Sequence, residues 1–471
     1  MVKNNILPVV FLIVLSSFSS ALYDEPYRPQ FHFSPPSGWM NDPNGLVYYD
    51  GLFHLFYQHN PVAPIHDNIH WGHAVSPDMV HWKNLAVAIA PYGKELIYSG
   101  SSIIDHNNVT GLQFDDHIQP LIAIFTAYNN DTGEQKQWLA YSNEGPEYEH
   151  FQYYNYNPII PNPNPSVQKD FRDPAVFQFN NHYVQVVAAH DHIMIYNSLD
   201  LLEWKLVSEF GMDQGSHIGT WECPSLFPIN VTINGLDVEK WVLIVGLTDF
   251  AIPTTQYYIG SFDGQTFINE NSEETVLWLE YGPDSFAGIT YNQLADGRRP
   301  FISWMNRWQY SKSFNFTAWN GQMGLARELK LTKIGNEIRL SSLPVREVQT
   351  LRINPVRRQN VTITNAFVFN IVEHDDEQSQ HQVDVEMTLD VTNLKAGDSF
   401  NIVFFDKKDS IKISFKANAF ILDRSNAGRT DFPNFGLLWK APRFIKSCEL
   451  KLRIVVDRSS IEFFAMMACL L

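Results

Sequence analysis

The sequence predicts an all-β protein in which a five-bladed β-propeller is followed by a C-terminal β-sandwich. Three observations lead to this prediction. Aromatic residues make up 14% of the 471 residues and charged residues only 18%, which is typical of a globular chain rich in strands. A short motif returns at a regular interval through most of the chain, and alternation of apolar and polar residues resumes after the last copy.

The repeated motif has the form S-x-D-x-x-x-aromatic, and each copy follows segments with the character of strands. It occurs as SPDMVHW (76–82), SLDLLEW (198–204) and SFDGQTF (261–267), and a looser relative, SNEGPEYEHF, begins at Ser142. A unit of about sixty residues that contains several short strands is typical of a propeller blade. The stretch from the mature N-terminus to about Leu343 is long enough for five such units. The alternative is a set of chance matches to a common turn pattern.

The sandwich is predicted from the alternating segments FVFNIV, VDVEMTLDV and KISFKANAFILD, which suit antiparallel strands with one buried face. The segment SLPVREVQTLRINP (342–355) is expected to join the two domains. The predicted boundaries are therefore a signal peptide at 1–21, the propeller at 22–342, a linker at 343–359 and the sandwich at 360–471.

The N-terminus predicts a secreted protein. Lys3 precedes the apolar run ILPVVFLIVL, and SSFSSA offers small residues for cleavage near Ala21. Five N-x-S/T sequons behind this segment predict N-glycosylation, at Asn108, Asn130, Asn230, Asn315 and Asn360. No stretch is long enough for a comfortable membrane span. The three cysteines exclude a disulfide framework, although a single Cys448–Cys469 bridge is conceivable.

The net charge of −17 argues against nucleic acid and anionic membranes as partners. Neutral substrates are compatible with it.

Three acids share one position in the repeat. Asp42 is followed by Pro43 and the strand-like GLVYYD, and Asp173 by Pro174 and AVFQF. Glu222 stands in the same way before Cys-Pro and SLFPI. Each acid is therefore expected just before the first strand of its blade. Because the first strands of all blades line the central channel, the three carboxylates are expected to meet at one end of it. The alternative is three independent turn-forming acids.

Converging carboxylates suit glycoside hydrolysis, which needs one acid to protonate the leaving oxygen and a second carboxylate to attack or to activate water. A third can hold sugar hydroxyls. Metal binding is the competing use, but no His stands at ligand spacing, and we expect no metal or other cofactor. Aromatic residues near the acids could stack on sugars or simply pack the blades, namely Trp39, Trp71, Tyr98, Trp221, Trp304 and Trp308.

The motifs WMNDPNG, FYQHNP, YSGS, FRDP, WECP and WMNRW, in this order, resemble glycoside hydrolase family 32, the invertases and fructan hydrolases. The resemblance runs from about Arg28 to Glu462 and implies a five-bladed propeller followed by a β-sandwich. It implies that Asp42 is the nucleophile, Glu222 the general acid/base and Asp173 the stabiliser of the transition state. The remaining residues implied for substrate binding are Asn41, Gln58, Trp71, Tyr98, Ser99, Arg172 and Trp308.

The substrate implied first by the resemblance is sucrose, with terminal β-D-fructofuranosides of fructans as the alternative. A fructosyltransferase, or a non-catalytic fructan-binding protein on the same scaffold, are further alternatives. The presence of all three acids disfavours a pure binding protein, which does not need them.

Two stretches depart from the family pattern. YGPDSFAG (281–288) has Ser285 and Phe286 where relatives read closer to D-F-Y-A, which leaves the leaving-group side of the pocket open. The sandwich strand VDRSSIEFF (456–464) is followed only by AMMACLL. We therefore expect an incomplete sandwich with an unpaired strand edge and poor solubility.

Overall fold

The computed structural model describes residues 23–248, 253–314, 316–353, 355–359, 361, 382–392, 397–406, 408–444 and 449–466. The predicted signal peptide, Asn315, Asn360, Cys448 and Cys469 lie outside these residues, as do the last residues of the predicted sandwich. Strands dominate the described residues, whose two helices are α1 (Trp308–Ser311) and a 3-10 helix (Arg346–Leu351). Neither helix approaches the length and apolar character that crossing a membrane requires.

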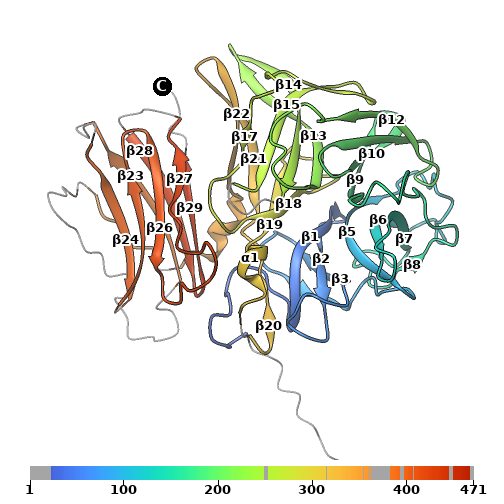
Figure 1. Cartoon of the computed structure of the whole chain (residues 1–471), viewed down its shortest axis with the longest axis horizontal. Helices are drawn as coiled ribbons and strands as arrows, with labels where there is room; N and C mark the ends of the chain where they lie inside the picture. The colour runs from blue at the N-terminus through green and yellow to red at the C-terminus, as the bar shows by residue number, and fades with distance from the viewer. Residues whose placement is uncertain are drawn as a thin grey trace, which may run out of the picture.

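Five antiparallel sheets form the propeller (Figure 1), and each is one blade. Blade I contains β1 (Gly38–Tyr49), β2 (Leu52–Asn60), β3 (His70–Ser76) and β4 (Lys83–Asn84). Blade II contains β5 (Glu95–Ile104), β6 (Leu121–Asn129), β7 (Gln135–Ser142) and β8 (Gln152–Tyr153), and blade III contains β9 (Arg172–Phe179), β10 (His182–Ala188), β11 (Ile193–Ser198) and β12 (Lys205–Phe210).

Blade IV contains β13 (Trp221–Ile233), β14 (Leu236–Leu247), β15 (Thr255–Phe262), β16 (Phe267–Asn269) and β17 (Leu277–Trp278). Blade V contains β18 (Phe286–Thr290), β19 (Pro300–Trp304), β21 (Arg327–Ile334) and β22 (Glu337–Pro344). The short strand β20 (Trp319–Asn320) comes between β19 and β21 in the chain but pairs in parallel with β1. It therefore ties the last part of the propeller to blade I.

The repeated motif occupies one position in the blades, as predicted. The third strands β3, β7 and β11 end at its serine, and β15 ends one residue later. Within the turn, the carboxylates of Asp78, Asp200 and Asp263 each accept two backbone N–H groups from the residues that follow. The residue after each Asp has a positive φ. The motif is thus the turn that leads out of the third strand.

Contacts between the inner strands close the ring. Each of β1, β5, β9 and β13 contacts the next inner strand, and β18 contacts both β13 and β1. Five apolar clusters lie between consecutive blades, and one of them joins blade V to blade I, where Trp304 and Trp39 have ring centroids 6.0 Å apart. Near the axis, the Asn292 side chain donates to the carbonyls of Ser102 (3.1 Å) and Val176 (2.8 Å). The predicted propeller is confirmed, and burial between the blades stabilises it.

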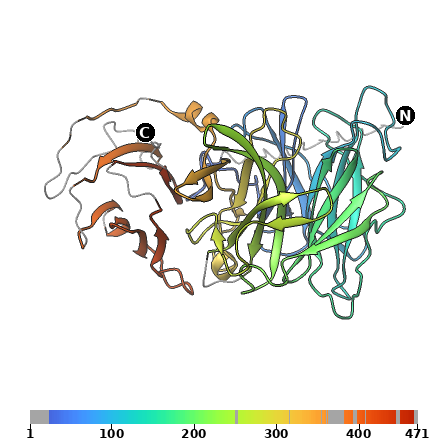
Figure 2. The same ribbon diagram turned by 90° about the horizontal axis from the view of Figure 1, so that it is seen from above.

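Two further sheets form the sandwich beside the propeller, as Figure 2 shows from above. One contains β23 (Val383–Asp390), β28 (Glu449–Asp457) and β29 (Ser460–Met466). The other contains β24 (Phe400–Asp406), β25 (Asp409–Phe415), β26 (Ala419–Asn426) and β27 (Trp439–Pro442). An apolar cluster of both sheets lies between them and includes Phe415 and Leu452. The predicted all-β class with a C-terminal sandwich is therefore confirmed.

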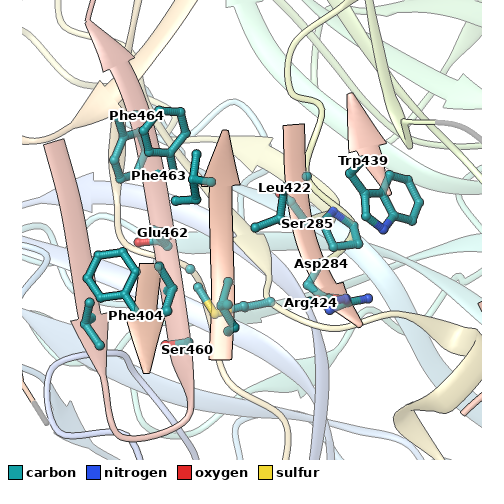
Figure 3. A pocket seen from close by; sticks show the side chains of 18 of the residues that line it. Asp284, Ser285, Phe404, Leu422, Arg424, Trp439, Ser460, Glu462, Phe463 and Phe464 are labelled. Carbon is teal, nitrogen blue, oxygen red and sulfur yellow. Dashed lines mark hydrogen bonds and ion pairs between the residues drawn. The ribbon is translucent and has the colours of Figure 1, made fainter. Parts of the chain in front are cut away.

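A large open crevice of about 3250 Å³ lies between the two domains (Figure 3). At its edge, Arg424 of the sandwich forms an ion pair with Asp284 and donates to the Tyr310 hydroxyl at 2.8 Å. On the propeller side, His32 lies buried between Asp457 (2.9 Å) and Glu462 (3.3 Å) of the sandwich. These contacts hold the sandwich against blades V and I.

Candidate active site

The three predicted acids come together at one end of the channel. Asp42 belongs to β1, Asp173 to β9 and Glu222 to β13, so three different blades contribute one acid each. The sequence placed the acids just before these strands, whereas the structure places them within the first residues of the strands. The difference arises because the backbone continues to pair on both sides of each acid.

A β-bulge occurs near the start of every inner strand. The register shifts between Met40 and Pro43 in β1 and beside Glu222 in β13, and β5, β9 and β18 have matching shifts. Within the bulges, Asp173 and Cys223 have φ values of 62° and 49°. A bulge bends the strand and re-aims a side chain. The bulges therefore change the direction of side chains at the strand starts, where the three acids stand.

Asp42 is held by two hydrogen bonds at its two oxygens. The Ser99 hydroxyl donates to Oδ2 at 2.7 Å, and the Asn41 amide donates to Oδ1 at 2.9 Å. The Trp39 indole N–H donates to the Asn41 carbonyl oxygen at 2.7 Å and so fixes the orientation of that amide. Burial raises the pKa of Asp42 to about 6, while both hydrogen bonds oppose the rise because they favour the ionised form.

Asp173 shares a hydrogen-bond donor with Asp42. The Cys223 backbone N–H donates to Asp173 Oδ2 at 3.0 Å, and the Cys223 Sγ lies 3.6 Å from Asp173 Oδ2 and 3.8 Å from Asp42 Oδ2. The Asp173 N–H in turn donates to the Thr126 hydroxyl at 3.0 Å. Burial raises the pKa of Asp173, with Arg172 acting in the opposite direction. Burial and the nearby carboxylates keep the pKa of the Cys223 thiol well above its usual range.

Sequence reasoning missed these two supporting residues. Cys223 stands inside WECP, but its position in the sequence indicates only that it separates Glu222 from the next proline. Thr126 lies in the second strand of blade II and carries no local signal.

Glu222 is paired with an arginine from the neighbouring blade. Arg172 donates to Glu222 Oε1 through Nε (3.2 Å) and Nη2 (2.7 Å). The two side chains are only 12% and 14% exposed. Burial raises the pKa of Glu222 to about 7, against the lowering effect of Arg172. Glu222 is thus the carboxyl group in this cluster that keeps its proton to the higher pH.

The other predicted substrate-binding residues fall into two groups. Tyr98 and Trp308 are half-buried. The ring of Tyr98 stacks on that of Tyr128 with centroids 4.6 Å apart, and the ring of Trp308 stacks on that of Trp39 with centroids 6.2 Å apart. Gln58 and Trp71 are buried, and they donate to the carbonyls of the strand that carries Ser99, at Ile97 (2.9 Å) and Tyr98 (3.0 Å). The second pair therefore supports the position of Ser99 beside Asp42.

Most of the aromatic residues near the acids pack the blades. Trp39, Trp71, Trp221 and Trp304 are fully buried, so of the six aromatics in question only Tyr98 and Trp308 have rings with exposed surface. Phe286 of the divergent stretch is also buried, against Trp304. Its neighbour Ser285 donates to Glu280 at 2.6 Å on the side that faces the sandwich.

The acids do not line the large crevice. A cavity of about 50 Å³ lies between the five inner strands, and Asp173 and Ser99 are in its wall together with residues from all of these strands. We assign the site to the channel because the perturbed carboxylates are there. Among the described residues, no three His, Cys, Asp or Glu side chains are arranged to hold a metal ion.

Both domains of the chain match models of known protein families. Residues 32–344 match the glycosyl hydrolases family 32 N-terminal domain, and residues 347–467 match the family 32 C terminal. The levanase of Bacillus subtilis (strain 168) is 40% identical over 94% of this chain, and the extracellular exo-inulinase inuE of Aspergillus ficuum is 33% identical over 98% of it. The chain spans 65% of that levanase, 48% of a levanase from Bacillus sp. (strain L7) and 91% of the exo-inulinase.

Solved structures show the same fold. The exo-inulinase of Aspergillus awamori superposes with a TM-score of 0.82 at 31% identity, covering 94% of this chain and 92% of its own. A variant of fructan 1-exohydrolase IIa from Cichorium intybus, in complex with 1-kestose, gives a TM-score of 0.77 at 26% identity, with 94% and 90% covered. The two family matches together cover most of the chain, in the order that the propeller and the sandwich follow. The chain belongs to glycosyl hydrolase family 32.

Proposed function

We propose that this protein is a secreted, retaining glycoside hydrolase that removes terminal β-D-fructofuranosyl units from sucrose and fructans. The observation that carries the proposal is the meeting of Asp42, Asp173 and Glu222, from three blades, in a chain of family 32. The names of its relatives, levanase and exo-inulinase, add fructans to sucrose as candidate substrates.

Asp42 is the proposed nucleophile. Its two hydrogen bonds from Ser99 and Asn41 stabilise the carboxylate and aim it, so that it attacks the anomeric carbon of the terminal fructosyl unit. The bond to the glycosidic oxygen breaks as the bond to Asp42 forms, and a covalent fructosyl-enzyme results.

Glu222 is the proposed general acid and base. Its higher pKa means that it still holds a proton at a pH where Asp42 is already ionised, which is the combination that the first step needs. Glu222 gives this proton to the departing oxygen. In the second step it takes a proton from water, and the water oxygen bonds to the anomeric carbon as the bond to Asp42 breaks. Fructose is released with retained configuration, and Asp42 is again a carboxylate.

Asp173 is the proposed stabiliser of the oxocarbenium-like transition state. The Cys223 N–H and the nearby Arg172 hold it while it accepts hydrogen bonds from fructose hydroxyls. Asn41, Ser99, Arg172, Tyr98 and Trp308 are proposed to contact the substrate, with Gln58 and Trp71 behind them supporting the strand that carries Ser99. These reactions require no metal or other cofactor.

Secretion and N-glycosylation are part of the proposal. The sequons at Asn108, Asn130 and Asn230 present exposed asparagines on the propeller surface. The exo-inulinase relatives are described as extracellular. The domain boundaries at 342/343 and 359/360 remain predictions.

The test is the release of glucose and fructose from sucrose, and of fructose from inulin and levan. Equal amounts of glucose and fructose from sucrose mean hydrolysis, whereas an excess of glucose means fructosyl transfer. Asp42→Asn is the matched inactive control. Binding of fructans without release of any sugar, in a protein whose melting curve shows it to be folded, would overturn the proposal in favour of a binding protein.

A further inference from the structure

Arg172 is shared among three carboxylates, of which Glu222 and Asp173 belong to the proposed catalytic set and Asp170 does not. Its Nε and Nη2 face Glu222, while its Nη1 forms an ion pair with Asp170. Asp170 precedes β9 and is 28% exposed, about twice as much as Glu222 at 14%. The guanidinium therefore bridges a buried acid and a more exposed one.

His190 extends this bridge to the surface. Its Nδ1 lies 3.0 Å from Asp170 Oδ2, and its side chain is 60% exposed. The His190 carbonyl also accepts a hydrogen bond from the Trp221 N–H at 2.5 Å. Because Trp221 directly precedes Glu222, this hydrogen bond joins the loop that carries His190 to the strand that carries Glu222. The chain of contacts thus runs from solvent through His190, Asp170 and Arg172 to Glu222.

We propose that Asp170 is a positioning residue for Glu222, which sets how strongly Arg172 holds that carboxyl group and thereby the pH at which activity is lost on the alkaline side. His190 is the solvent-facing partner of Asp170. The inference rests on the proposed function, in which Glu222 must be protonated for the first step.

The direction of the effect follows from the charges. A guanidinium that faces Glu222 alone would favour its carboxylate and release its proton at lower pH. Asp170 forms an ion pair with the same guanidinium and so weakens its interaction with Glu222. It also places a negative charge near Glu222. Both effects favour the protonated form of Glu222. Burial raises the pKa of Asp170, but Arg172 and His190 outweigh it and hold that pKa below its usual value. Asp170 therefore carries its charge throughout the working range.

Other groups also face this network. Asp173 and Arg172 of β9, Asp42 of β1 and Tyr98 of β5 interact electrostatically with Glu222, and Cys223 is its neighbour on β13. On the outer side, Asp191 interacts with His190. All of these side chains keep their identity when Asp170 or His190 is replaced, so a shift in the alkaline limb reports the change at Asp170 and its effect through Arg172.

The test compares pH profiles of kcat/KM for fructose release by four variants. In Asp170→Asn the alkaline limb should move to lower pH by about 0.5 to 1 unit, because Arg172 is then free to hold Glu222 alone. Asp170→Glu should keep the wild-type limb. His190→Arg places a permanent positive charge beside Asp170 and should shift the alkaline limb in the same direction but less. Because this position is exposed, the smaller shift should decrease with added salt.

Glu144→Gln is the matched control. It breaks a similar surface pair, in which Glu144 lies 2.6 Å from the Nδ1 of His150, without any contact to the acids. The alkaline limb of its pH profile should coincide with that of the wild type. A stable Asp170→Asn enzyme whose alkaline limb also coincides with that of the wild type would overturn the inference, and Asp170 would then be a structural residue only.

Direct titration separates this inference from the proposed function. In protein labelled with 13C at glutamate carboxyl carbons, the Glu222 signal is the one that disappears in Glu222→Gln. Its midpoint should fall in Asp170→Asn whether or not the protein releases fructose. A chain that releases no fructose refutes the proposed function, whereas an unmoved Glu222 titration refutes the role of Asp170.

Discussion

Replacing Ser99 by alanine removes the hydroxyl that donates a 2.7 Å hydrogen bond to Asp42 Oδ2. The second donor, the Asn41 amide, stays in place because it is bound to the other oxygen. The substitution is small, and Ser99 is buried on a strand whose backbone is held by Gln58 and Trp71. The change therefore acts on the charge state of Asp42 more than on the fold.

The size of the effect can be worked out from the hydrogen bond. A hydrogen bond to a charged group contributes about 1.5–3 kcal/mol, which corresponds to a rise of about one to two units in the pKa of Asp42. That pKa then moves from about 6 to roughly 7–8, at or above the value of about 7 for Glu222. The form with Asp42 ionised and Glu222 protonated becomes scarce at every pH. We expect the optimum to rise by about 0.5–1 unit and the maximal kcat/KM to fall about two- to fivefold.

The assay is the pH profile of kcat/KM for fructose release at constant ionic strength. Ser101→Ala is the matched control, because Ser101 lies on the same strand and its hydroxyl accepts the Val176 N–H at 2.8 Å without touching Asp42. Its profile should follow the wild type. An acidic limb that stays in place in Ser99→Ala would show that Ser99 does not stabilise the ionised form of Asp42, and the reasoning from this hydrogen bond would be wrong.

Three further predictions concern the acids and the domain contact. Asp42→Asn should lower kcat by several orders of magnitude with an unchanged melting curve, and a variant with a tenth of the wild-type kcat would refute its role as nucleophile. Glu222→Gln should remove the alkaline limb of the pH profile and affect good leaving groups least, so an unchanged limb would contradict the acid/base role. Asp457 and Glu462 raise the pKa of buried His32 to about 9 against the effect of burial, so its protonation favours the folded state. This stabilisation, about 3 kcal/mol, is complete below pH 6.5 and is lost as the pH rises through 9. The denaturant concentration at the unfolding midpoint should therefore decrease as the pH is raised from 6 to 9.5, and it should decrease less in His32→Gln. An equal decrease in both proteins would exclude His32 as the cause.

Much of the fold could be predicted because the blades repeat. The Asp of the motif makes the same turn after the third strand in blades I, III and IV, and such a turn requires the same residue types each time. Blade V lacks the motif, and only the remaining length of chain indicated it. The parallel pairing of β20 with β1 could not be predicted, since it joins two residues to a strand far away in the sequence.

The site could be predicted as a set of acids but not as a set of contacts. Asp42, Asp173 and Glu222 are visible because each stands close to a proline and a strand. Cys223 and Asp170 act through contacts with another blade or with the next strand, and nothing in the local sequence marks such a partner. Four tryptophans near the acids suggested sugar stacking, but aromatic rings also fill the space between blades, and burial decides between the two uses.

The bulges explain why acids with different spacing from their strands can serve one site. In regular strands, a shift of one residue turns a side chain to the opposite face of the sheet. Each bulge has two unpaired residues. Asp42 is the second of these in β1, and Asp173 is the first of these in β9. Glu222 is the last paired residue before the bulge of β13. Without bulges, these three positions would not all turn their side chains to the same side of their strands. The extra residue in each strand interrupts the alternation of side chains between the two faces of the sheet. The positive φ of Asp173 and Cys223 changes the direction of the backbone at the bulge. The convergence of the acids is therefore a property of the bulged strand starts, which are the least regular part of an otherwise repetitive fold.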